Sequence, residues 1–111
     1  MVFERWDVAI ALFPFTDQSV RKPRPVVVLS GASFNEEHDH VIVGMITTGA
    51  GSSWTSDHPI VDLTAAGLRH PCVVRWKVFT LPTGVITRRI GQLGPRDQAA
   101  LASRLAGILL A

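Results

Sequence analysis

The stretch that decides the fold is Arg24-Pro25-Val26-Val27-Val28-Leu29-Ser30, a continuous aliphatic run between an arginine and a serine. Such a run is typical of a strand that is covered on both faces. A second apolar run occupies residues 41–47 and ends at Thr47-Thr48. If the two strands pair antiparallel through residues 31–40, which we expect to form a loop, Arg24 and the two threonines meet at one edge of a small sheet. A guanidinium and two hydroxyls at one edge can hold and polarise a phosphodiester.

The rest of the chain predicts short strands followed by one helix. Its 111 residues are enough for a single core, so we expect residues 1–111 to form one domain. Further strands are predicted at residues 6–12, 59–62, 72–76 and 78–81, the last two as one bent strand or two short ones. Residues 63–68 are predicted to form a helical turn, and residues 88–93 a strand or a loop. This order indicates a mainly β fold, a small and strongly curved barrel.

The C-terminal segment is the clearest helix. Pro95 suits the first turn of a helix, and Gly94 lies just before it. From there four aliphatic residues recur at helical spacing and form one stripe: Leu101, Leu105, Ile108 and Leu109. We expect this stripe to pack on the sheet, and a contact with a partner or a second copy is the alternative.

Charge and cysteine usage restrict the class of protein. The net charge is only +2, but Arg21, Lys22 and Arg24 cluster before one strand, and clustered cations favour contact with phosphate groups. Cys72 is the sole cysteine, so an internal disulfide is excluded and a reducing compartment fits. The sequence has neither a signal-peptide pattern nor an apolar run that could span a membrane. We therefore expect a cytoplasmic protein without membrane contact.

Two side chains are the main candidates for chemistry. The fork of Arg24 matches two phosphate oxygens, although a charge that flanks an aggregation-prone strand is the structural alternative. The hydroxyl of Thr47 can donate to a phosphate oxygen as negative charge builds on it, although a threonine at a strand end often only satisfies backbone groups. Trp54, in a loop rich in Ser, Thr and Gly, can stack an unpaired base or fold back onto the barrel.

Other candidate sites have weak support. His38-Asp39-His40 lacks further ligands at a metal-binding spacing, so we expect no metal. We expect His58 to be a solvated loop histidine and Cys72 a buried apolar residue. No nucleotide-binding, serine-hydrolase or zinc-protease motif occurs, and no cofactor is predicted.

The chain resembles the MazF/PemK family of toxins from toxin–antitoxin pairs. The residues that carry the resemblance, in order along nearly the whole chain, are Asp7-Val8, Phe13-Pro14-Phe15-Thr16-Asp17, the 24–30 stretch, Ile46-Thr47-Thr48, Phe79-Thr80-Leu81 and Arg89-Ile90-Gly91-Gln92-Leu93. Two positions depart from the family pattern. The family usually has glycine where this chain has Trp6, and some members carry a glutamate in the loop where this chain offers only Asp17.

The resemblance implies an SH3-like barrel with a C-terminal helix, a homodimer and a cognate antitoxin partner. It also implies metal-independent, sequence-selective cleavage of single-stranded RNA such as mRNA. The RNA's 2′-hydroxyl attacks the adjacent phosphate and leaves a 2′,3′-cyclic phosphate and a 5′-hydroxyl. The family's active arginine and threonine fall on Arg24 and Thr47. Residues 16–23 match the segment that gates access of RNA and antitoxin. We expect RNA contacts from Asp17, Ser19, Arg21, Lys22, Thr48 and Trp54.

Two other functions fit the same barrel. A CcdB-like toxin binds DNA gyrase and cuts nothing, which would place function on the dimer surface and the terminal helix. An inactive RNA-binding barrel would show salt-sensitive binding and no cyclic-phosphate product. The arginine and threonine pair favours the ribonuclease.

Overall fold

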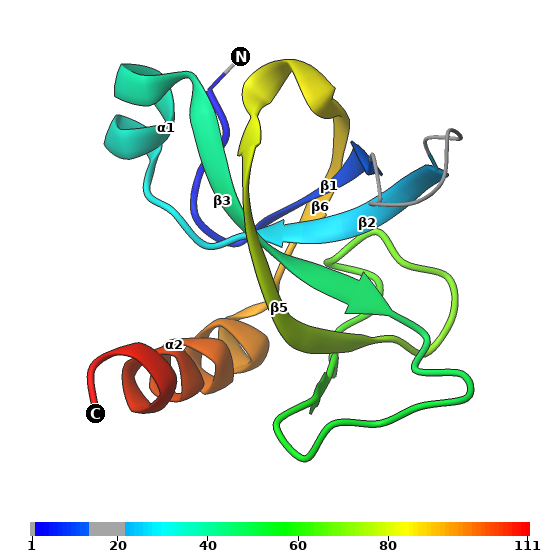
Figure 1. The fold of residues 1–111 in the computed structure, drawn as a ribbon. Helices are drawn as coiled ribbons and strands as arrows, with labels where there is room; N and C mark the ends of the chain where they lie inside the picture. Colours follow the sequence, from blue (N-terminus) through cyan, green and yellow to red (C-terminus); the bar gives the residue numbers. More distant parts are fainter. Residues whose placement is uncertain (1, 14–21) are drawn as a thin grey trace.

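The computed structural model describes residues 2–13 and 22–111, which form a curled antiparallel sheet with a C-terminal helix (Figure 1). Within these residues the strands are β1 (Asp7–Phe13), β2 (Lys22–Val28), β3 (His40–Thr47), β4 (His58–Pro59), β5 (Val73–Pro82) and β6 (Ile86–Gln92). Their order in the sheet is β4-β5-β3-β2-β1-β6. The helices are α1 (Ala32–His38) and α2 (Pro95–Leu109), with a 3-10 turn η1 (Thr83–Val85) between β5 and β6. The predicted mainly β fold is confirmed.

The centre of the sheet is buried on both faces, as the valine run predicted. Val26 and Val28 point to one face and belong to a core that also contains Ala9, Ala11, Val41, Val43 and Leu81. Val27 points to the other face, where it packs with Ile46, Val74 and the helix residue Leu101. Strands covered on both sides show continuous hydrophobic runs because no position faces water. We call these two clusters the inner core and the helix-side core.

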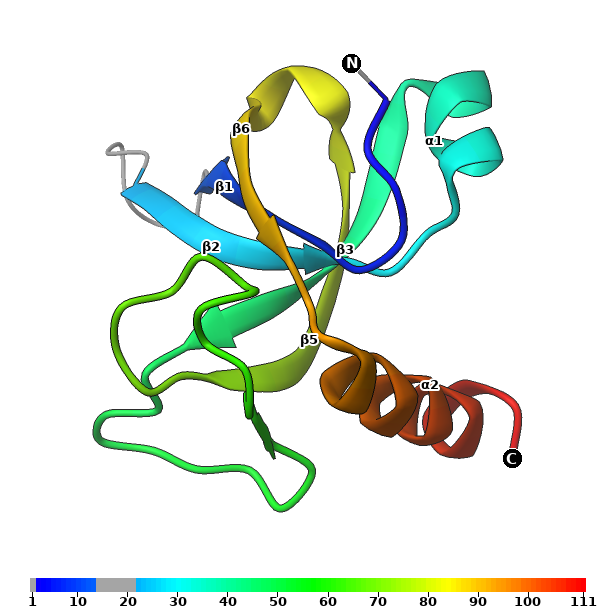
Figure 2. The same ribbon diagram turned by 180° about the vertical axis from the view of Figure 1, so that it is seen from behind.

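Helix α2 begins as predicted and lies against the sheet at its N-terminal end (Figures 1 and 2). Gly94 precedes it in an extended conformation, Pro95 occupies the first turn, and Leu101 is completely buried. The predicted apolar stripe is only partly used, because Ile108 and Leu109 are 48% and 65% exposed. The second half of the stripe is therefore available to a partner.

The prediction of a loop over residues 31–40 is wrong, because Ala32–His38 form the short helix α1. The helix is held by side chains rather than by an apolar stripe. Asn35 is buried, donates to the carbonyl of Phe3 at 2.8 Å and accepts from the hydroxyl of Ser30. Ser30 in turn accepts from the backbone N–H of Ile42 at 2.9 Å. Because these bonds to distant residues stabilise the helix, its short and polar sequence shows no apolar residues at helical spacing from which a helix could be predicted.

One other boundary differs from the predictions, whereas the predicted bend in the long strand is found. β4 comprises only His58–Pro59 instead of residues 59–62. Residues 63–67 form hydrogen-bonded turns that are closed by Gly67 at φ +72°, as predicted, with bonds from Gly67 N–H to Thr64 O and from Leu68 N–H to Leu63 O. Residues 73–82 form one bent strand, since the pairing with β3 jumps from Gly44 opposite Val78 to Met45 opposite Arg75. The two residues between them on β5 form a bulge, which bends the strand.

The turn at residues 63–67 is fixed against β6 by glycine. Gly67 has φ +72°, and a Cβ there would lie 2.1 Å from the carbonyl oxygen of Ile90. A Cβ on Gly91 would lie 2.5 Å from the carbonyl oxygen of Ala65. Only glycine allows this close approach of two backbones.

Candidate functional site

Arg24 and Thr47 lie at the point where β2 and β3 part. The two strands pair with Val26 opposite Met45, Val27 opposite Gly44 and Val28 opposite Val43. Among the described residues this pairing stops at Val26, and β2 continues beside β1 while β3 continues beside β5. Extending the register by two residues places Arg24 level with Thr47. The strands diverge there in both views (Figures 1 and 2).

The two side chains belong to the same face of the sheet. Side chains alternate along a strand, so Arg24 faces the same way as Val26, which lies in the inner core. Thr47 likewise faces the same way as Val43, another residue of the inner core. Both are half-buried, whereas Thr48 and Lys22 are exposed. One guanidinium and one hydroxyl, 23 positions apart in the chain, therefore share one end of one face.

Arg24 has unused hydrogen-bonding capacity. Its Nε is buried and has no hydrogen-bond partner among the residues that the structure describes. Buried polar atoms are nearly always paired, and an unpaired one requires an explanation. An Nε–H without an acceptor among the described residues is suited to an anionic ligand, which would supply the missing oxygen.

The hydroxyls of Thr47 and Thr48 are oriented by the loop that follows them. Thr47 Oγ1 accepts from the backbone N–H of Gly49 at 3.2 Å, and Thr48 Oγ1 accepts from that of Ala50 at 3.4 Å. Each oxygen thus serves as an acceptor, and its own hydrogen remains free to donate. This geometry provides hydrogen-bond donors at the end of β3.

The other predicted RNA contacts divide into two groups. Asp17, Ser19 and Arg21 lie outside the described residues. Trp54 lies in the loop between β3 and β4, and the residue is 42% exposed. It neither enters the core nor stands alone, because the guanidinium carbon of Arg75 is 5.6 Å and Lys77 Nζ 5.7 Å from the ring centroid.

Arg75 is the residue that the sequence reasoning missed. Its side chain is only 7% exposed and forms an ion pair with Asp57, Nη2 to Oδ2 2.8 Å. This bond to Arg75 lowers the pKa of Asp57 below its ordinary value, and the reciprocal bond raises the pKa of Arg75. The available signal was a lone cation inside the apolar run 73–76, which requires a buried partner.

The prediction for His58 is wrong. The side chain is only 12% exposed, and Nε2 lies 2.8 Å from Oδ1 of the fully buried Asp97. Burial favours the neutral acid of Asp97, but the N–H groups of Asp62 and Val61 and the contact with His58 outweigh it and lower the pKa of Asp97.

The other candidate sites gain no support. Burial raises the pKa of the Cys72 thiol, which disfavours a nucleophilic role. The described residues contain no cluster of three or more metal-ligating side chains.

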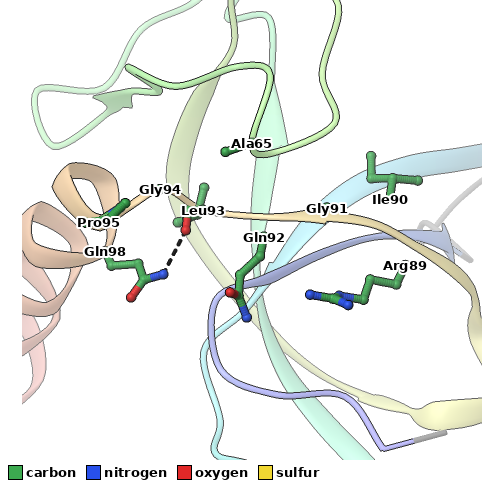
Figure 3. A pocket seen from close by; sticks show the side chains of 9 residues that line it. All are labelled: Ala65, Arg89, Ile90, Gly91, Gln92, Leu93, Gly94, Pro95 and Gln98. Carbon is green, nitrogen blue, oxygen red and sulfur yellow. Dashed lines mark hydrogen bonds between the residues drawn. The ribbon is translucent and has the colours of Figure 1, made fainter.

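An open hollow between β6 and the start of α2 is distinct from this site (Figure 3). Gln98 Nε2 donates to the carbonyl of Leu93 there at 2.7 Å. Arg89 and Gln92, which also line it, are both engaged by the buried Asp7. Its polar groups are thus largely satisfied within the protein.

Comparison with known proteins identifies the family. Residues 4–109 match the family described as PemK-like, MazF-like toxin of type II toxin–antitoxin systems. The chain belongs to this toxin family. The expected MazF/PemK resemblance is confirmed over almost the whole length.

Solved structures of MazF toxins share the fold. The Mycobacterium tuberculosis toxin MazF-mt6 is 26% identical, with a TM-score of 0.72 over 91% of this chain and 93% of that one. MazF from Deinococcus radiodurans is 15% identical, with a TM-score of 0.78 over 100% and 99%. A MazE–MazF structure from the same organism is 15% identical, with a TM-score of 0.75 over 98% and 97%. A search of the curated proteins found no match.

The fold of this toxin contains no helix, within the described ranges, that is long and apolar enough to cross a membrane. Arg24 and Thr47 each lie two residues beyond the last β2–β3 pair, Val26 opposite Met45, where the two strands diverge.

Proposed function

We propose that this toxin is an endoribonuclease that cuts single-stranded RNA without a metal ion. The observation that carries the proposal is the position of Arg24 and Thr47 at one end of one sheet face, with Arg24 Nε buried and without a partner among the described residues. The RNA's own 2′-hydroxyl is the nucleophile, so no protein side chain has to act as one. The protein instead has to align the 2′-oxygen, the phosphorus atom and the leaving 5′-oxygen. The products are a 2′,3′-cyclic phosphate and a 5′-hydroxyl.

Arg24 neutralises the charge that develops on the scissile phosphate. Its guanidinium supplies paired donors to the non-bridging oxygens, and partial burial strengthens that interaction over its value in water. Thr47 donates its free hydroxyl hydrogen to one of these oxygens and orients the phosphate. Donors fixed in advance at the developing charge are the largest single contribution in many enzymes of this kind.

We further propose that the partners of this toxin are RNA, a cognate antitoxin and a second copy of the chain, in the cytoplasm. The exposed C-terminal half of the α2 stripe supplies an apolar surface for a protein partner. The solved MazE–MazF structure with the same fold supports an antitoxin partner. RNA contacts from Lys22, Thr48 and Trp54, and from Asp17, Ser19 and Arg21, stay a prediction.

The test uses the purified toxin and a mixed-sequence single-stranded RNA in the presence of EDTA. We expect cleavage to continue, with cyclic phosphate detected at the 3′ ends by mass spectrometry. Arg24→Ala should lower kcat by about 10³-fold, the scale seen when a charge-stabilising group is removed. Arg104→Ala, on the exposed face of α2, is the control. Cleavage by Arg24→Ala at the wild-type rate would refute the site, and inhibition of DNA gyrase without RNA cleavage would refute the proposed function.

A further inference from the structure

Arg75 is a buried cation that the proposed chemistry does not use. It lies on β5 opposite Met45, and its guanidinium forms a two-bond fork with Asp57, Nε to Oδ1 3.1 Å and Nη2 to Oδ2 2.8 Å. Replacing a buried ion pair by apolar residues is often neutral or stabilising. The ion pair is therefore weak evidence for a role in stability, and its further hydrogen bonds point to a positioning role.

The segment that Arg75 positions is the loop of residues 48–57. Arg75 Nη1 donates to the hydroxyl of Ser52 at 2.9 Å, and Nη2 donates to the Ser52 carbonyl at 3.3 Å. Asp57, held by the same guanidinium, accepts from the backbone N–H of Trp54 at 2.9 Å. One side chain thus connects both halves of a loop that has no regular secondary structure. Binding residues often lie on loops that a rigid scaffold holds in place.

The loop presents an indole ring at the surface. Trp54 is 42% exposed, with Arg75 and Lys77 both near the ring. The bulge in β5 contains Lys77 and brings this cation to the same ring as Arg75. An exposed aromatic ring beside cations is the arrangement that single-strand binding proteins use, in which a base stacks and its phosphate meets a positive charge.

This ring lies on the side of the sheet that carries the candidate catalytic pair. Thr47 is opposite Val73 and Met45 is opposite Arg75, so Arg75 belongs to the same face as Thr47. The chain also returns to Arg75 directly after the threonines, because a Cβ on Gly49 would lie 4.0 Å from Arg75 Nη2. The loop that starts at the catalytic threonine is therefore fixed by Arg75.

We infer that Arg75 is a positioning residue, which fixes the 48–57 loop so that Trp54 stacks an unpaired RNA base beside the phosphate held by Arg24 and Thr47. The inference rests on the proposed function for its substrate. It adds to that function a preformed base-binding subsite and the side chain that builds it. Because the loop is already ordered before RNA binds, binding loses less conformational entropy.

The test measures stacking separately from cleavage. Short RNAs carry 2′-deoxy sugars, which remove the nucleophile, and one 2-aminopurine that is moved along the sequence. We expect the wild-type toxin to quench 2-aminopurine fluorescence at one position. Trp54→Ala should abolish the quench and raise Kd about 5- to 100-fold, whereas Trp54→Phe should retain part of both.

Arg75→Lys keeps the positive charge but loses the two-bond fork of the guanidinium. It should therefore shift or abolish the fluorescence quench and raise KM about tenfold. We expect kcat at saturating RNA to stay within about twofold of wild type. Arg104→Lys on α2 is the matched control. If Arg75→Lys does not fold, Ser52→Ala, which removes one acceptor of the guanidinium, should give a smaller change in the same direction.

The outcomes separate the two proposals. Quenching at one position by a toxin that cuts no RNA would support the subsite and refute the ribonuclease. Cleavage with wild-type KM and an unchanged quench in both Trp54→Ala and Arg75→Lys would refute the subsite alone. A loss of thermal stability in Arg75→Lys with an unchanged quench and KM would show a purely structural role, and it would overturn the inference.

Discussion

His58 Nε2 lies 2.8 Å from Asp97 Oδ1 and thereby joins the edge strand β4 to the first turn of α2 across 39 residues of sequence. Asp97 is completely buried and also accepts from the backbone N–H groups of Val61 and Asp62, at 2.9 and 3.0 Å. A single carboxylate therefore attaches the helix to the segment that covers the helix-side core.

Replacing this carboxylate should destabilise the whole domain. In the wild type the two carboxylate oxygens of Asp97 accept from three donors, which are on His58, Val61 and Asp62. The amide of Asp97→Asn has only one oxygen, so buried N–H groups lose their acceptor. We expect the free energy of unfolding to fall by about 2–3 kcal/mol, measured by urea denaturation at neutral pH. Glu37→Gln, with a side chain 75% exposed, should change it by less than about 0.5 kcal/mol.

The acid limb of the stability curve should depend on Asp97 and Asp57. Both have a folded-state pKa below the ordinary value of 3.8. Their contribution is complete above the unfolded-state pKa and is lost as the pH falls through the lower folded-state pKa. We expect the urea midpoint of the wild type to drop below about pH 4, and Asp57→Asn and Asp97→Asn to show a shallower drop. An equally steep drop in both variants would contradict this assignment.

The hydroxyl of Thr47 should matter more than its shape. Thr47→Val is nearly isosteric but cannot donate, so kcat should fall by about 10²- to 10³-fold. Thr47→Ser keeps the hydroxyl and should retain activity within about tenfold. Cleavage of a fluorogenic RNA under single-turnover conditions measures both, and equal rates in the two variants would show that the hydroxyl is not used.

At position 6 we expect glycine to give a more stable protein than alanine, which is the opposite of the order found at most positions. Trp6 has φ +75°, a conformation that L residues rarely adopt and that glycine adopts readily. Its backbone is held on both sides, by a bond from its N–H to Val28 O and one from Leu93 N–H to its carbonyl. Trp6→Gly should therefore be more stable than Trp6→Ala by about 1 kcal/mol, because only alanine retains the strain. Thermal denaturation of the two variants tests this order.

Gly67 should tolerate no side chain. A Cβ there would meet the Ile90 carbonyl at 2.1 Å in a backbone with φ +72°, so Gly67→Ala should lower the free energy of unfolding by about 2–4 kcal/mol. Gly107→Ala, in α2 with nothing within 4 Å of a built Cβ, should raise it by about 0.5–1 kcal/mol. Denaturation curves that move in the same direction for both would show that the close approach is absent.

The local sequence pattern correctly predicted the central strand and the start of the C-terminal helix. The valine run indicated a strand covered on both faces, and Pro95 after Gly94 marked the start of α2. The order of Arg24 and Thr47 along the chain was enough to bring them to one end of the sheet once their strands pair antiparallel. These features were predictable because alternation, helical spacing and turn residues act between close neighbours in the sequence.

Only the tertiary structure decided which polar side chains meet. Arg75 and Asp57 are 18 residues apart, and His58 and Asp97 are 39 apart. The bulge in β5 and the close contact of Gly67 with β6 likewise have no local signal in the sequence. A buried charge or a short polar helix such as α1 is stable only with its distant partners in place, so its conformation cannot be inferred from its own residues.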